Sequence, residues 1–93
     1  MAVLSGQKTV ATAGTAVQAS TDTTVRDYML RANPGNTGNI AIGNDGANDV
    51  TVNNGLVLAK TDPPIPFRGS LSDVWVDAAT NGDKLCWFRV DTQ

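Results

Sequence analysis

The sequence contains no histidine, and this absence removes the commonest general base and the commonest metal ligand of proteins. A Ser-His-Asp or Cys-His catalytic arrangement is therefore impossible. All nine acidic residues are aspartates, and most of them stand beside Asn, Gly, Thr or Ser, where solvated turn residues are expected. Catalysis by carboxylates needs two acids held close together with shifted pKa values, and the spacing indicates no such pair. The sequence predicts a protein that is not an enzyme and needs no cofactor or metal.

Cysteine is nearly absent too, because Cys86 is alone and an intrachain disulfide is excluded. It lies in the apolar run Leu85–Phe88, where we expect it to pack as a small hydrophobic side chain. A fold without covalent links is consistent with synthesis in a reducing cytoplasm. The first eight residues lack the basic start and long apolar centre of a signal peptide, which favours the same compartment. No apolar stretch approaches the roughly 20 residues of a membrane span, so no membrane partner is predicted.

Clusters of charge are missing as well. The seven basic residues are scattered over a chain of formal charge −2, so the sequence does not predict a nucleic-acid partner. Asn44–Asp49 is rich in oxygen ligands, but its spacing does not match a calcium-binding loop and no glutamate follows; we interpret it as a turn. The glycines between Asn33 and Gly43 do not form the G-x-G-x-x-G pattern of a phosphate-binding loop.

What the chain has in abundance is Thr, Val, Asn, Gly and Asp, which is the composition of strands and turns. Short strand patterns recur every 8–12 residues or so, with turn signals between them. We therefore predict an all-β fold: a small single-domain antiparallel sandwich or barrel, jelly-roll-like, of about eight short strands over residues 1–93. A domain this small buries roughly 60–65% of its unfolded surface, so oligomerisation is expected to contribute to stability.

The strongest strand signals flank Asn33–Asn39, a segment of Asn, Pro, Gly and Thr. We predict that Tyr28–Ala32 and Ile40–Gly43 form a β-hairpin around it and that this hairpin is the nucleus of the fold. Period-two alternation assigns the core face of each strand. The residues predicted to face inward are Tyr28, Leu30, Ala32, Ile40 and Ile42, and Ala41 is predicted to face outward.

Turn residues divide the rest of the chain. Asn53-Asn54-Gly55 predicts a second hairpin, of Asp49–Val52 with Leu56–Leu58. The prolines of residues 61–66 predict an extended connection or sheet edge, since proline removes ladder donors. The other expected elements are two short strands or one bent strand at Lys8–Ala11 and Thr15–Gln18, a strand from Ile65 to Arg68, a short helical turn at Ser70–Val74, and final strands at Val74–Asp77 and Lys84–Val90.

Apolar residues beyond the core suggest contacts with other proteins. Residues 1–7 begin with an apolar patch and form either a frayed terminus or an arm that packs on a neighbour. Both faces of Leu85–Val90 are largely apolar, which indicates a subunit contact on one face or ordinary packing in a thin core. Trp75 alternates with two valines and is predicted to face outward. The candidate protein-contact residues are Met1, Val3, Leu4, Trp75, Trp87 and Phe88.

Five segments, which together span nearly the whole chain, also carry a resemblance. They are Ala13–Gln18, Leu30–Gly43, Asn54–Leu58, Leu71–Val76 and Gly82–Trp87. In these strand-and-turn patterns the sequence resembles a family of small virion proteins of tailed bacteriophages, often encoded among head genes. After the third segment it departs from the family's Pro-Gly-Glu-like turn, since Ala59–Pro66 stands there.

The resemblance implies a capsid decoration (cement) protein, or another accessory head protein, without catalytic residues. It implies synthesis in the host cytoplasm and a final location on the capsid surface of the virion. The implied partners are the major capsid protein and further copies of the chain, as a homotrimer or dimer. The alternative is a carbohydrate-binding or tail adhesion module on the virion surface, with Trp75 or Trp87 as a stacking platform.

Overall fold

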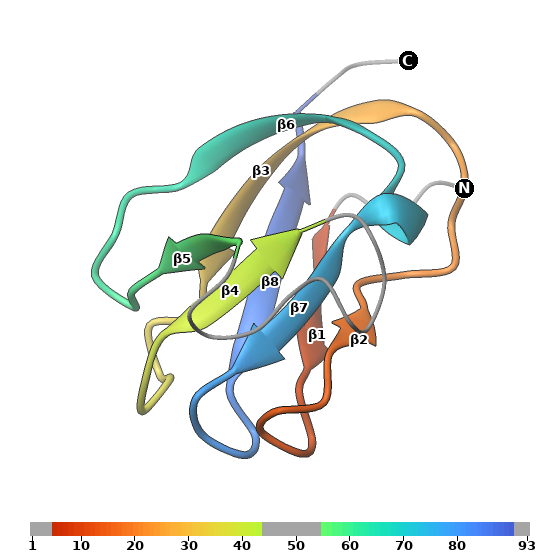
Figure 1. Cartoon of the computed structure of the whole chain (residues 1–93). Helices are drawn as coiled ribbons and strands as arrows, with labels where there is room; N and C mark the ends of the chain where they lie inside the picture. Colours follow the sequence, from red (N-terminus) through yellow and green to blue (C-terminus); the bar gives the residue numbers. More distant parts are fainter. Residues whose placement is uncertain (1–4, 44–54, 91–93) are drawn as a thin grey trace.

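The computed structural model describes residues 5–43 and 55–90, which form two antiparallel sheets packed face to face (Figure 1). The predicted all-β antiparallel fold of about eight short strands is confirmed, and of the two predicted alternatives, sandwich and barrel, it is the sandwich. The first sheet has the order β1 (Ser5–Thr9), β8 (Lys84–Arg89), β3 (Arg26–Ala32), β6 (Ile65–Gly69). The second has the order β2 (Val17–Gln18), β7 (Trp75–Ala78), β4 (Ile40–Gly43), β5 (Leu56–Leu58). A 3₁₀ turn, η1 (Leu71–Asp73), precedes β7, within the predicted Ser70–Val74 segment.

The core lies between the sheets and follows the predicted alternation. On β3 every second side chain from Tyr28 is buried, and on β4 the two isoleucines are buried opposite them. These apolar side chains join one cluster drawn from both sheets, so burial of apolar area holds the layers together. The predicted inward residues are all confirmed as core: Tyr28, Leu30, Ala32, Ile40 and Ile42.

The predicted hairpin of Tyr28–Ala32 with Ile40–Gly43 is wrong, because β3 and β4 lie in different sheets. The connecting loop is held instead by the loop before β8. Asn36 is buried; its side chain donates to the Lys84 carbonyl at 2.9 Å and accepts from the Lys84 amide at 2.8 Å. The buried Asp83 carboxylate accepts the amides of Thr37 and Gly38, at 2.9 and 2.8 Å. These long-range bonds turn the chain from one layer into the other.

Ala41 points to the outer face of the second sheet, as predicted, but it is not open to solvent there. It is 0% exposed, because other residues cover it. Ala16 and the half-buried Trp75 pack with Ala41 in a second small cluster. The covering segment is tied down by the Gly14 amide, which donates to Oδ1 of Asp77 at 2.9 Å. The outer face of the second sheet is therefore covered at Ala41 and Asp77, while Val57 on β5 stays exposed.

The proline-rich segment ends at the sheet edge, as predicted. β6 is the edge strand of the first sheet, and Pro66 stands opposite Met29 with its ring on the outer face. An edge position tolerates a residue without a backbone donor. At the other edge, Ser5–Gln7 belong to β1 and pair with β8, so this part of the predicted arm, residues 1–7, is a strand of the sheet. The prediction of an arm now concerns residues 1–4 alone. Those residues lie outside the described part of the chain, as do the predicted Asp49–Val52 strand and the Asn44–Asp49 turn.

Candidate protein-contact surfaces

The outer face of the first sheet, meaning the side turned away from the second sheet, has an apolar centre. Strand register places Phe88, Met29 and Pro66 in one row across β8, β3 and β6. Cys86 lies two residues before Phe88 on β8, on the same face. Val90 follows β8, and its amide donates to the Asp27 carbonyl at 2.9 Å. Apolar side chains thus occupy the middle of the sheet as well as its edge.

This face is open to solvent in the single chain. Phe88 is 54% exposed and Val90 46%, while Pro66 is exposed and Met29 half-buried. An isolated exposed apolar residue is ordinary, but a contiguous group marks a contact surface. This contact surface also explains why both faces of the last strand are apolar. Leu85 faces the core, and Phe88 faces outward without cover from the described residues.

Charged side chains border this apolar centre along β3. Asp27 lies on one side of Met29, and Arg31 lies on the other. Arg68 on β6 donates from Nη1 to both carboxylate oxygens of Asp27, at 3.0 and 2.9 Å. The Arg31 Nε donates to the backbone carbonyl of Ala32 at 3.2 Å. The face therefore combines an apolar middle with acidic and basic groups beyond it, which is the anatomy of a protein interface.

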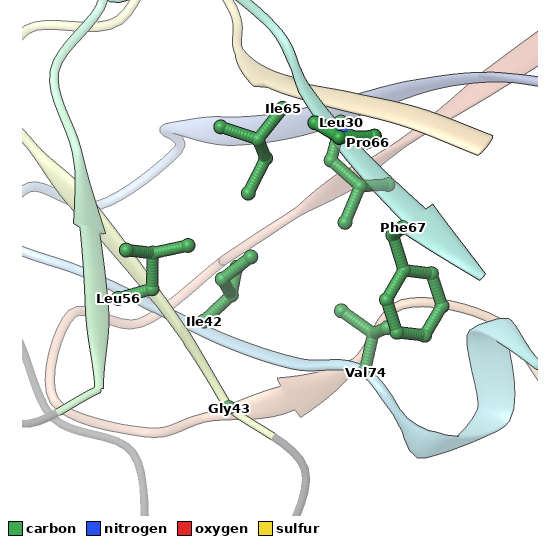
Figure 2. A pocket seen from close by; sticks show the side chains of 8 residues that line it. All are labelled: Leu30, Ile42, Gly43, Leu56, Ile65, Pro66, Phe67 and Val74. Atoms are coloured by element: carbon green, nitrogen blue, oxygen red, sulfur yellow. The ribbon is translucent and has the colours of Figure 1, made fainter. Parts of the chain in front are cut away.

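A second apolar surface opens where β5 and β6 lie at the same side of the sandwich. Between them is a groove of about 290 Å³ that reaches the core. Figure 2 shows side chains of β4 and β5 on one side of this groove and those of β3 and β6 on the other. Leu56 is 50% exposed at the rim. The groove is lined by Leu30, Ile42, Gly43, Leu56, Ile65, Pro66, Phe67 and Val74.

The two tryptophans, predicted as contact or stacking residues, are both half-buried. Trp75 lies on the outer face of its sheet, as predicted, and packs on Ala16 and Ala41. Trp87 packs against the main core, and its indole lies against Gly6 of the neighbouring strand. Each indole already has protein against it, so these positions favour packing over an open stacking platform.

Replacing Gly6 with alanine is expected to displace the Trp87 indole, because the added Cβ would lie 2.7 Å from Cζ2 of that ring. We expect a loss of about 1–2 kcal/mol in the free energy of unfolding, as for other overpacked sites. Trp87 fluorescence should shift, measured in a Trp75→Phe background. Ser5→Ala, at an exposed position of the same strand, is the control and should change neither. Unchanged emission and stability in Gly6→Ala would contradict this packing.

The structure thus separates the six candidate contact residues. Phe88 is on an exposed surface, the two tryptophans are partly covered, and Met1, Val3 and Leu4 lie outside the described residues. Sequence reasoning missed Met29, Pro66 and Val90, which surround Phe88 or extend its row. Alternation along β3 had placed Met29 away from the core, but only the strand order brings it beside Phe88.

Over residues 5–43 and 55–90, no group of three or more His, Cys, Asp or Glu side chains is placed to hold a metal ion. Within the same ranges no helix is long and apolar enough to cross a membrane. Comparison of the chain with protein-family models, curated proteins and solved structures finds no match. Function is therefore inferred from these surfaces and from the sequence resemblance.

Proposed function

We propose that this chain is a structural virion protein, a capsid decoration or cement protein that stabilises a phage head by bridging capsid subunits. One observation carries the structural role: exposed apolar side chains gather on two sides of the described sandwich, at the outer face of the first sheet and at the β5–β6 groove. Two contact surfaces on one small domain suit a protein that joins neighbours. The capsid as its location is supported by the sequence resemblance alone.

The mechanism needs no reactive group. A cement protein adds binding free energy between subunits that internal pressure would otherwise separate. A contact that buries roughly 1,600 Å² in total is sufficient for stable attachment. Phe88 and Leu56 are the apolar side chains best placed to enter pockets on a partner, because each is at least half exposed on a hydrogen-bonded strand. The major capsid protein and further copies of the chain are the partners that this proposal names.

The carbohydrate-binding alternative has weaker support. It depends on an accessible aromatic ring, and both tryptophans pack against protein. Phe88 is an exposed ring on the outer face, but the Asp27 carboxylate of that face is already bonded to Arg68 rather than left open to a sugar.

Attachment to the particle tests the proposed function. Mass spectrometry of purified virions is expected to find the chain in many copies, and imaging is expected to place it outside the shell. Particles made without it should lose DNA at a lower temperature, and adding the purified protein should restore their resistance. A chain absent from particles, or present without any effect on their stability, would contradict the proposal.

A further inference from the structure

The outer face of the first sheet has a symmetry that the proposed function does not use. Asp27, Met29 and Arg31 are alternate residues of β3 and lie on the same side of the sheet. Met29 is at the middle, with Phe88 and Pro66 beside it in its row. The acid and the base are equally far from this apolar row, one on each side. Such an arrangement is complementary to itself after a half-turn.

We propose that this face binds a second copy of the chain in a two-fold dimer. The axis lies between the first sheets of the two copies, runs perpendicular to the strands and passes through the row of Met29. The half-turn places each strand over the same strand of the second copy, in the opposite direction. Met29, Phe88 and Pro66 then meet their own counterparts. Asp27 faces Arg31 of the second copy, and the reverse contact forms at the same time, as an isologous interface requires. The proposal deepens the proposed structural role, because it names what one of the two surfaces binds.

The geometry allows these charges to meet. Residues two apart on a strand are separated by about 6.7 Å along it. Packed sheets cross at about 30°, which displaces Asp27 and the opposing Arg31 by only about 3 Å, within reach of an arginine side chain. Asp27 can keep its bond to Arg68, since a carboxylate accepts from more than one guanidinium group.

The size of the face sets the expected affinity. Four strands about 4.8 Å apart and about 20 Å long cover about 400 Å² per copy. The dimer would bury about 800 Å² in all, below the standard size of stable complexes. We therefore expect a weak dimer whose population rises with concentration in the micromolar to millimolar range.

Sedimentation equilibrium of the full chain tests this directly. The average mass is expected to rise from 9.7 kDa toward twice that value as concentration increases to about 1 mM. Val57→Asp, at an exposed position on the second sheet, is the matched control and should dimerise like the original chain. A mass that stays at 9.7 kDa throughout, or a dimer lost in the control, would overturn the proposal.

Two charge reversals test the register. Asp27→Arg places arginine opposite arginine in both symmetric contacts, and Arg31→Asp places aspartate opposite aspartate. Each variant alone is expected to dimerise about tenfold to 100-fold more weakly. Mixed in equal amounts, they should form a heterodimer with affinity near the original, because both contacts again join opposite charges. If either variant dimerises normally, or the mixture stays monomeric, this arrangement is wrong.

Circular dichroism checks that each variant is folded. Should Asp27→Arg fail to fold, Phe88→Ser provides a second test, since it removes an exposed side chain from the apolar row and should weaken the dimer at least about tenfold. The outcome is also separable from the proposed function. Particles that bind the two reversed variants normally would leave the capsid role intact while the dimer fails, and the opposite result would leave the dimer without a capsid role.

Discussion

Replacing Asp83 with asparagine is expected to lower the free energy of unfolding by about 2–3 kcal/mol. The carboxylate is buried and accepts two backbone amides, from Thr37 and Gly38. Asparagine has the same size but only one acceptor oxygen, so its NH₂ group would face one of these N–H donors. The loss combines a missing hydrogen bond with a buried donor left without a partner, and it loosens the loop that carries the chain between the sheets.

Urea unfolding gives this loss directly, and the melting temperature should fall by roughly 10–20 °C in a domain of this length. Asp73→Asn is the matched control. Asp73 is exposed, and its carboxylate accepts the Ser70 hydroxyl at 3.2 Å. That change should stay within about 0.5 kcal/mol. Equal losses in the two variants would mean that Asp83 does not anchor the loop.

Local pattern was sufficient to predict the strands and which side of each faces the core. Alternation of apolar residues identifies the core side of β3 because a strand places successive side chains on opposite faces. Proline identifies β6 as an edge because the missing donor has a direct cost inside a sheet. Both signals act over a few neighbouring residues, so one sequence is enough to read them.

The partner of each strand could not be predicted in the same way. The Asn33–Asn39 segment signals a reversal of the chain, but a reversal also serves a connection between two sheets. What decides between them is a set of bonds from Asn36 to Lys84 and from Asp83 to the loop, across more than 40 positions of sequence. A buried Asn or Asp in a loop has the same local sequence as a solvated one. The error about the hairpin therefore came from tertiary bonding.

The candidate surface shows the same limit. Sequence alternation identified Phe88 on a strand with two apolar faces, but strand order is needed to set Met29 and Pro66 beside it. The charges that give this face its symmetry, Asp27 and Arg31, alternate with the core residues of β3 and lie on the outer side. Their relation to a partner emerges only when the rows of the sheet are known.

Ala41→Asp is expected to lower the free energy of unfolding by at least about 3 kcal/mol. Ala41 is fully buried, and Asp77, directly opposite it on β7, is 1% exposed. A new carboxylate there would lose its water and stand beside an existing buried carboxylate, so desolvation and like-charge repulsion act together. If the variant does not fold at all, Ala41→Leu gives a measurable version, since overpacking of a closed site costs about 1–3 kcal/mol.

Val57→Asp is the matched control, because Val57 is the other neighbour of Ala41 in the same row and is 41% exposed. Its cost should stay below about 1 kcal/mol. The comparison by urea unfolding decides whether the second sheet is covered: if Ala41→Leu and Val57→Asp are both tolerated, that face is open, as the alternation alone suggested. A large loss at Ala41 together with a small one at Val57 leaves the outer face of the first sheet and the β5–β6 side as the surfaces available to partners, and it directs contact mutations to Phe88 and Leu56 rather than to Trp75.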